Sequence, residues 1–279
     1  MTTVLEAIDG GARYLEKRGI EDARRNMQLL LADGLGCSRM DLYTQFDRPL
    51  DESELAPVRE RLRRRGEGVP LQHLLGTVSF HNRDFRCDAR ALIPRPETEE
   101  LAAAVLEKET REAIDVLDVG CGSGVLGLTL AAERPGWRVR LSDLCTDALA
   151  LARENAASLG LDGCTFAAGD LMEPWAGESF DGVVANLPYI PEPERATLSR
   201  EVAHDPDVAL FSGADGLDAI RRLIPAAHAA LRPGGWLALE IGHDQGAAVA
   251  GLMKQAGFSE VRVDADLSGI PRFPWGLRG

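Results

Sequence analysis

Apolar residues recur at helical spacing through the first quarter of the chain. They lie three or four positions apart in two runs, formed by Val4, Ile8, Ala12 and Leu15 and by Met27, Leu30, Leu31 and Leu35. This spacing is typical of amphipathic helices, because 3.6 residues complete one helical turn. We predict a small helical domain over residues 1–69, whose last helix begins near Asp51 or Ser53 and ends at Gly66 and Gly68.

The pattern changes to short alternating segments between residues 70 and 90. Two such segments, 76–80 and 83–88, flank His81 and Asn82. Alternating apolar and polar residues on either side of a turn are typical of paired strands. The sequence therefore predicts a β-hairpin linker over residues 70–90.

From residue 91 onward, strand-like segments alternate with helical ones. The predicted strands are 114–120, 137–143, 165–170, 180–188 and 236–242, followed by strand-like segments around Val261 and Phe273. The predicted helices are 125–134, 146–160, 215–235 and 246–258. This alternation indicates an α/β domain over residues 91–279, with a doubly wound, mostly parallel sheet that ends in an antiparallel hairpin strand.

Composition supports a globular protein and changes little in this picture. The chain of 279 residues is 45% hydrophobic and 27% charged, which allows a sizeable core. It contains no run of about 18 apolar residues, and its N-terminus is charged where a secretory signal would be apolar. Its five cysteines include no C-x-x-C pair and its histidines do not cluster with them, so we expect a cytoplasmic protein without a metal centre.

The formal net charge of −13 narrows the range of partners. A negative protein repels phosphate backbones at long range, so a protein or small-molecule substrate is favoured over nucleic acid. The arginines between Arg59 and Arg65 are typical of a solvated helix face. Contact with an acidic partner is the alternative for that run.

A glycine-rich segment, Asp118–Gly124, lies between a predicted strand and a predicted helix. Its glycines allow a tight turn and close approach to a ligand, and the helix N-terminus offers free N–H groups to an anion. The G-x-G-x-G spacing differs from that of dinucleotide dehydrogenases, and no Walker-type lysine follows. A tight turn without a binding role is the alternative for this segment alone.

Two acids, Asp143 and Asp170, end the next two predicted strands. Asp143 lies where related folds place a carboxylate on ribose hydroxyls. Either acid could instead cap a helix or stabilise a turn, although Thr146 and Asp147 are better capping candidates than Asp143.

The fourth predicted strand leads directly into Asn186-Leu187-Pro188-Tyr189. The nitrogen of a planar amide or amine NH₂ group is a poor nucleophile because its lone pair is delocalised, so a site that methylates it must hold both N–H groups. The Asn186 side-chain oxygen and the Leu187 carbonyl can accept them, while Pro188 restricts Leu187 and Tyr189 offers an aromatic wall. An Asx-type turn is the alternative for this tetrapeptide.

Together the glycine loop and the two acids resemble the cofactor site of class I S-adenosylmethionine-dependent methyltransferases. The resemblance implies a Rossmann-like methyltransferase sheet with S-adenosyl-L-methionine as cofactor. It places the loop against the methionine part, Asp143 on the ribose, and Asp170 with Leu171 beside the adenine. The implied cofactor-binding residues are Gly120, Cys121, Gly122, Ser123, Gly124, Asp143, Asp170, Leu171 and Asn186.

Further segments resemble the release-factor glutamine N5-methyltransferases. They are Leu92–Glu99 (LIPRPETE), Pro70–Gly76, Glu201–Pro206 and Ser212–Leu217. The resemblance covers nearly the whole chain and implies methylation of the glutamine in the Gly-Gly-Gln loop of peptide-chain release factors. It implies a helical domain that grips the factor and supports catalytic roles for Asn186, Leu187, Pro188 and Tyr189. We also expect a monomer, and the net charge argues against direct nucleic-acid contact. Arg95, Glu97 and Glu99 would line the substrate-side rim, or form a salt-bridged loop and helix cap.

One residue departs from the family pattern. The family usually has Asn-Pro-Pro-Tyr, whereas Leu187 makes this tetrapeptide the form seen in rRNA adenine dimethyltransferases. Glutamine in a release factor is the favoured acceptor for three reasons. Residue 187 need supply only its carbonyl, the IPRPETE segment lies outside what adenine dimethyltransferases share, and the net charge opposes RNA. The alternatives are glutamine in a ribosomal protein, adenine N6 in RNA or DNA, and a non-catalytic cofactor-binding regulator.

Overall fold

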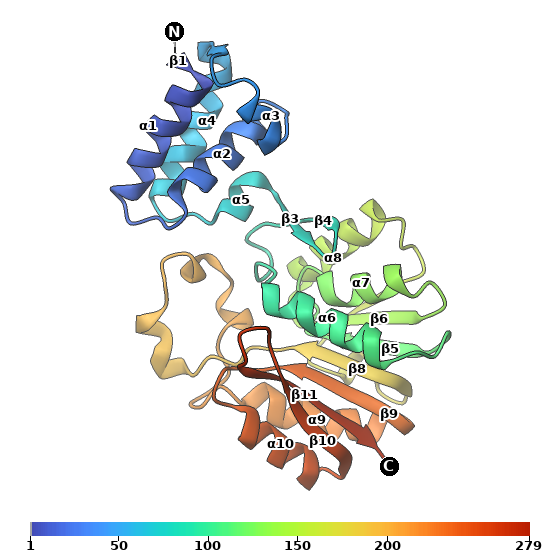
Figure 1. Ribbon diagram of the computed structural model, residues 1–279. Helices are drawn as coiled ribbons and strands as arrows, with labels where there is room; N and C mark the ends of the chain where they lie inside the picture. The colour runs from blue at the N-terminus through green and yellow to red at the C-terminus, as the bar shows by residue number, and fades with distance from the viewer. Residues whose placement is uncertain (1) are drawn as a thin grey trace. The chain divides into compact units, whose positions relative to one another are not determined.

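The computed structural model describes residues 2–279, which divide into two compact units (Figure 1). The first unit comprises Met1–Thr77 with Ser199–His204, and the second comprises Val78–Leu198 with Asp205–Gly279. Each unit has its own buried apolar core. The segment Ser199–His204 therefore belongs to the N-terminal unit although it lies far along the sequence.

The first unit is a helical bundle, which confirms the prediction for the N-terminal region. Its elements are β1 (Thr2–Thr3), α1 (Val4–Glu16), α2 (Ala23–Gly34), α3 (Arg39–Tyr43), β2 (Pro49–Leu50), α4 (Glu52–Gly66) and α5 (Leu71–Leu75). Capping boxes begin α1, α3 and α4, with Thr3, Ser38 and Asp51 as the N-cap residues. Asp51, not Ser53, thus begins the last long helix, and α1, α2 and α4 meet around Ile8 and Leu31.

The arginine run on α4 is mostly a solvated, salt-bridged face, as predicted. Its first three arginines form ion pairs within the unit, Arg59 with Glu52, Arg61 with Asp33, and Arg63 with Glu60 and Glu67. Arg65 differs because its side chain is buried. Its Nε donates to Asn26 Oδ1 at 2.7 Å, and its guanidinium pairs with Glu201 of the Ser199–His204 segment.

A hairpin of β3 (Thr77–Phe80) and β4 (Arg83–Arg86) follows α5. His81 and Asn82 form its turn with φ of 48° and 60°, the left-handed conformations that a tight two-residue hairpin turn requires. The residues before the hairpin, within the linker predicted over 70–90, form helix α5. Pro70 provides the N-cap of that helix, and Gly76 ends it with φ of 74°.

The second unit contains a seven-stranded sheet of the predicted α/β class. Its strands are β5 (Asp115–Val119), β6 (Arg138–Asp143), β7 (Thr165–Ala168), β8 (Phe180–Asn186), β9 (Leu231–Glu240), β10 (Phe258–Ala265) and β11 (Pro271–Arg278). They lie in the order β10-β11-β9-β8-β5-β6-β7, parallel from β9 to β7, while β11 is antiparallel to both β9 and β10. This topology confirms the predicted doubly wound sheet with an antiparallel C-terminal hairpin.

Helices cover both faces of this sheet (Figure 1). They are α6 (Pro96–Lys108), α7 (Val125–Glu133) and α8 (Thr146–Ser158) on one face, and α9 (Asp218–Ala230) and α10 (Gly246–Gln255) on the other. Successive strand residues supply the two cores alternately, since Val116 packs with the first set of helices and Leu117 with the second. Of the helices in residues 2–279, none is long and apolar enough to cross a membrane.

Two predictions about this unit need correction. No helix is predicted between residues 91 and 114, yet α6 begins at Pro96 and buries Leu101 and Val105. The helix predicted over 215–235 is shorter, because β9 already begins at Leu231. Pro233 and Gly234, the latter with φ of 75°, cannot continue a helix.

We predict that Gly182→Ala destabilises the second unit. Gly182 lies in β8 opposite Trp236, and an added Cβ would lie 2.2 Å from the Trp236 ring. That ring cannot move freely, because it stacks on Trp275 at 5.0 Å and its Nε1 donates to Glu109 at 2.9 Å. Overpacking should lower the free energy of unfolding by about 1–3 kcal/mol in urea denaturation. Gly163→Ala is the control, since nothing lies within 4 Å of its added Cβ; equal stability of the two variants would contradict the prediction.

Candidate active site

A cavity of about 240 Å³ opens at the carboxyl ends of the parallel strands. Its wall includes the glycine loop Gly120–Ser123, Asp143, and the segment Asn186–Pro188. All of its lining residues belong to the second unit. This is the edge at which open α/β sheets bind their ligands.

The glycine loop takes a conformation that glycine favours. Gly120, Gly122 and Gly124 have φ of 69°, 55° and 84°. The N–H groups of Gly120 and Cys121 both donate to the Ser142 carbonyl, at 2.8 and 3.0 Å, so the loop is fastened to the end of β6. Around Gly122 the backbone faces open space, since an added Cβ would meet only Ala91, at 3.9 Å. The loop therefore leaves room for close approach by a ligand.

Asp143, at the end of β6, joins the glycine loop to the residues that lead into α8. Its two carboxylate oxygens accept hydrogen bonds from the N–H groups of Gly122 and Cys145, each at 2.8 Å. Burial raises the pKa of the carboxyl, and these backbone bonds act in the opposite direction. Each carboxylate oxygen has two lone pairs, so Asp143 can still accept hydroxyl groups from a ligand in the cavity.

Asp118 lies beneath the loop and is almost fully buried. Its Oδ2 accepts a hydrogen bond from Gly127 N in the first turn of α7, at 2.8 Å. Desolvation raises the pKa of Asp118 to about 7, with the Gly127 bond opposing and the nearby Asp143 charge adding to the shift. Asp118 thus binds one free N–H group of the helix N-terminus that borders the cavity.

Asp170 and Leu171 also line the cavity. Asp170 forms an ion pair with Arg222 of α9, a cavity residue that the sequence analysis did not single out. Leu171 has φ of 50°, and its carbonyl accepts a hydrogen bond from Ser142 Oγ at 3.0 Å. The Asp170 carboxylate at this rim is therefore neutralised by a cation.

Asn186 stands at the carboxyl end of β8, directly opposite Glu240 of β9. Its Nδ2 donates to Thr98 Oγ1 at 2.9 Å, and the Thr98 hydroxyl donates to Glu240 Oε2 at 2.7 Å. Neither Thr98 nor Glu240 was assigned a role from the sequence. Thr98 belongs to the LIPRPETE segment, and Glu240 lies at the carboxyl end of a predicted strand. Their positions in the sequence could therefore have identified both as candidate site residues.

The rest of the tetrapeptide divides between cavity and interior. Leu187 and Pro188 line the cavity, and the Leu187 side chain packs over Gly120, where an added Cβ would lie 2.6 Å from Leu187 Cδ2. Tyr189 does not line the cavity. Its hydroxyl donates to Glu240 Oε1 at 3.5 Å, and burial raises its pKa above the ordinary value.

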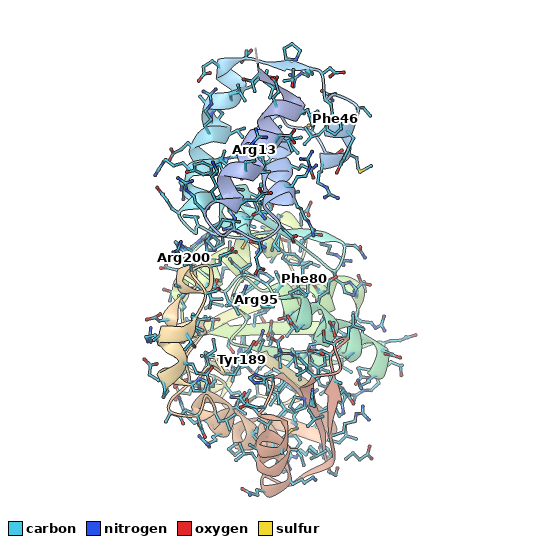
Figure 2. All side chains as sticks on the ribbon, turned by 60° about the vertical axis from the view of Figure 1, so that its left-hand side comes forward. Arg13, Phe46, Phe80, Arg95, Tyr189 and Arg200 are labelled. Atoms are coloured by element: carbon cyan, nitrogen blue, oxygen red, sulfur yellow. The ribbon has the colours of Figure 1, made fainter. Side chains whose placement is uncertain are left out.

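The LIPRPETE segment is held by Asp205, from a second segment that the sequence analysis singled out. Asp205 Oδ1 accepts from Ile93 N at 3.0 Å, and Oδ2 pairs with Arg95 at 2.6 Å. Glu99 accepts from His81 N at 2.9 Å in the β3–β4 turn. Arg95 and Tyr189, both labelled in Figure 2, are each bonded to a buried carboxyl group, Arg95 to Asp205 and Tyr189 to Glu240.

Within residues 2–279, no group of three or more His, Cys, Asp or Glu side chains is arranged to hold a metal ion. The groups around the cavity are instead backbone N–H donors, the carboxyl groups of Asp118, Asp143 and Asp170, and amide or hydroxyl groups. That set suits an organic ligand with hydroxyl and charged amino-acid groups. A ligand that carries a ribose and an amino acid, such as S-adenosylmethionine, fits these donors and acceptors.

Comparison with known proteins agrees with this geometry. Residues 6–76 match the family model described as PrmC N-terminal domain, and residues 98–214 match the one described as methyltransferase small domain. The chain is 38% identical over 278 residues to the release factor glutamine methyltransferase of Geobacter sulfurreducens, covering 99% of this chain and 97% of that protein. It is 42% identical over 260 residues to the enzyme of the same name from Deinococcus radiodurans, covering 93% of this chain and 92% of that protein.

Among solved structures, a methyltransferase from Pyrococcus furiosus resembles this chain with a TM-score of 0.55 and 16% identity. The match covers 72% of this chain and 91% of that chain. At this identity the likeness concerns the fold, and it confirms the Rossmann-like methyltransferase sheet.

The burial of Asp118 generates a pH prediction. A carboxyl whose pKa is higher in the folded state stabilises the fold below its unfolded pKa, and this contribution is lost as pH rises through about 7. Asp118→Asn keeps the acceptor for Gly127 N but cannot ionise. From about pH 4 to 7, wild-type stability should fall relative to the variant by up to about 1.4 kcal/mol per pH unit.

Urea unfolding followed by tryptophan fluorescence at several pH values measures this difference. Asp162→Asn, at an exposed turn position, is the matched control and should follow the wild type. Parallel stability curves for wild type and Asp118→Asn would show that the buried carboxyl is not proton-linked to folding.

Proposed function

The chain belongs to the release factor glutamine methyltransferase family, and from this premise we propose that it methylates a glutamine side chain of peptide-chain release factors. The methyl donor is S-adenosyl-L-methionine, and the acceptor is N5 of the glutamine in the Gly-Gly-Gln loop. The observation that carries the proposal is the meeting of the glycine loop, Asp143 and Asn186 in one cavity. Near full-length similarity to enzymes of that name supports the choice of acceptor.

The cofactor roles follow from the cavity wall. We propose that Gly120–Gly124 faces the methionine part, Asp143 accepts the ribose hydroxyls, and Asp170 with Leu171 borders the adenine. When bound, S-adenosylmethionine supplies a methyl group already activated by its sulfonium. The open backbone at Gly122 and the spare lone pairs of Asp143 support this assignment.

The residues of the tetrapeptide then hold the acceptor. Asn186 Oδ1 accepts one N–H of the glutamine amide, and the Leu187 carbonyl accepts the other. Pro188 restricts Leu187 to an extended conformation and so fixes the direction of that carbonyl. Holding the nitrogen in line with the methyl carbon removes much of the entropic barrier, an effect worth up to roughly 7–11 kcal/mol.

Tyr189 has a supporting role in this proposal. Its hydroxyl bonds to the buried Glu240 and does not face the cavity, so it braces the end of the tetrapeptide. The helical N-terminal unit is proposed to bind the body of the release factor, in keeping with its match to the PrmC N-terminal domain model. We propose that the enzyme acts as a monomer on protein, because the net charge of −13 opposes a phosphate-rich acceptor.

The proposed reaction predicts which macromolecule becomes labelled. With S-adenosylmethionine carrying a labelled methyl group, label should enter a purified release factor and disappear when its loop glutamine is replaced by alanine. Ribosomes and protein-free RNA are tested in parallel. Label on RNA or on a ribosomal protein, with none on the factor, would overturn the proposed acceptor.

Two variants should separate acceptor alignment from cofactor binding. Asn186→Ala removes one acceptor of the substrate amide and should lower kcat by at least about 100-fold, with cofactor affinity in calorimetry little changed. Asp143→Ala removes the carboxylate of the ribose site and should weaken cofactor binding by about 10- to 100-fold. Asp162→Ala, at an exposed turn, serves as the control. A fully active Asn186→Ala enzyme, or unchanged cofactor affinity in Asp143→Ala, would refute the corresponding role.

A further inference from the structure

Three side chains from different elements are joined by hydrogen bonds at the cavity wall, which Asn186 and Thr98 line and Glu240 does not. Asn186 ends β8, Thr98 lies in the first turn of α6, and Glu240 ends β9. The distances are 2.9 Å from Asn186 Nδ2 to Thr98 Oγ1, and 2.7 Å from Thr98 Oγ1 to Glu240 Oε2. Thr98 and Glu240 are only 4% and 1% exposed, so water does not compete for these bonds.

The number of available protons decides which group donates in each of these hydrogen bonds. A threonine hydroxyl has a single proton, and an ionised carboxylate can only accept. When Thr98 donates to Glu240, its oxygen must accept the next hydrogen bond, and only the NH₂ group of Asn186 can donate it. The Asn186 amide is therefore oriented by Glu240, two hydrogen bonds away.

This orientation matters for the proposed reaction. An asparagine amide is nearly symmetrical in shape, so packing alone distinguishes its oxygen from its nitrogen poorly. With Nδ2 held by Thr98, the remaining acceptor is Oδ1, the atom needed to receive an N–H of the glutamine amide. If the Asn186 amide were flipped, its N–H groups would face the N–H groups of the substrate glutamine, and the two would repel each other.

We propose that Thr98 and Glu240 are positioning residues that keep Asn186 Oδ1 directed at the acceptor nitrogen. The inference rests on the proposed function and adds two residues to it. Neither residue touches the reacting atoms in this proposal. Both act through the orientation of Asn186.

The surroundings of Glu240 support the same inference. Glu97 of α6 adds a like charge nearby, while Arg272 of β11, Thr98 and the Tyr189 hydroxyl favour the ionised form. Arg272 is itself paired with Asp266, at 2.8 Å. Desolvation outweighs these effects and raises the pKa of Glu240 to about 7. When Glu240 is protonated it can donate to Thr98, which frees the threonine proton to bind Asn186 Oδ1 and flip the amide.

Thr98→Val is the first test, because valine keeps the shape of threonine and removes the hydroxyl. Measured on the labelled release factor, kcat should fall about 10- to 100-fold, the range usual for residues that orient a reacting group, while cofactor affinity stays at the wild-type value. Thr98→Ser restores the hydroxyl and should restore kcat. Thr129→Val is the matched control, since Thr129 of α7 is fully buried and its hydroxyl has no hydrogen-bond partner.

Glu240→Gln is the second test and uses the pH profile. In the wild type kcat should rise with pH through about 7, as Glu240 ionises. The glutamine variant cannot ionise and can place either its oxygen or its NH₂ toward Thr98. We expect a lower kcat and loss of this rise with pH. Since the two side chains have nearly the same shape, this test holds even if Thr98→Val folds poorly.

The outcomes separate this inference from the function on which it rests. A wild-type enzyme that labels no release factor overturns the proposed function, and the positioning role falls with it. A wild type that labels the factor, with Thr98→Val equal in kcat to Thr129→Val, overturns only the positioning role. An unchanged pH profile in Glu240→Gln does the same.

Discussion

Parallel pairing of the central strands is the constraint on which the rest of this structure depends. β5 pairs with β6 and β8, and β8 pairs with β9, all in the same direction. Their carboxyl ends therefore lie at one edge of the sheet, although the chain reaches them through separate crossover helices. Each of these strands carries a polar side chain at that end, namely Asp118, Asp143, Asn186 and Glu240.

Grouping these side chains away from water has an energetic cost that the local structure offsets. A buried polar group is tolerated when its hydrogen bonds are made. Asp118 accepts from the first turn of α7, Asp143 from two loop N–H groups, and Glu240 from Thr98 and Tyr189. Burial nevertheless raises the pKa of all three carboxyl groups. Such raised pKa values are typical of functional sites, where titratable groups are buried close together.

The sequence predicted what depends on local pattern. Alternation of strands and helices gave the doubly wound sheet, and Gly120–Gly124 and Asn186 were found because a strand end marks each of them. Helix α6 was overlooked because the LIPRPETE motif runs into its first turn, although Pro96 and the acids after it are typical of a helix start. The side chains that orient Asn186 could not be predicted in the same way. Thr98 lies 88 residues from Asn186 and 142 from Glu240, and only the folded sheet brings them together.

The residue type of Tyr189 did not predict the direction of its side chain. An aromatic residue beside a planar acceptor suggested a wall of the cavity, but its hydroxyl finds a buried carboxyl partner in Glu240. A buried tyrosine usually places its O–H where a hydrogen bond is available, and this requirement decides its direction. Side-chain direction at the end of a strand thus depends on neighbouring strands that the local sequence does not identify.

Leu187, the residue that departs from the family pattern, packs against the glycine loop. Its side chain packs against Gly120, where an added Cβ would lie 2.6 Å from Leu187 Cδ2, so a side chain at residue 120 would force the leucine to move. Leucine is longer than proline and fills this space, being only 4% exposed. The proposed acceptor role at position 187 uses the main-chain carbonyl, whose direction depends on the following Pro188. The change from proline to leucine therefore alters the packing between the two loops and leaves the proposed hydrogen-bonding group in place.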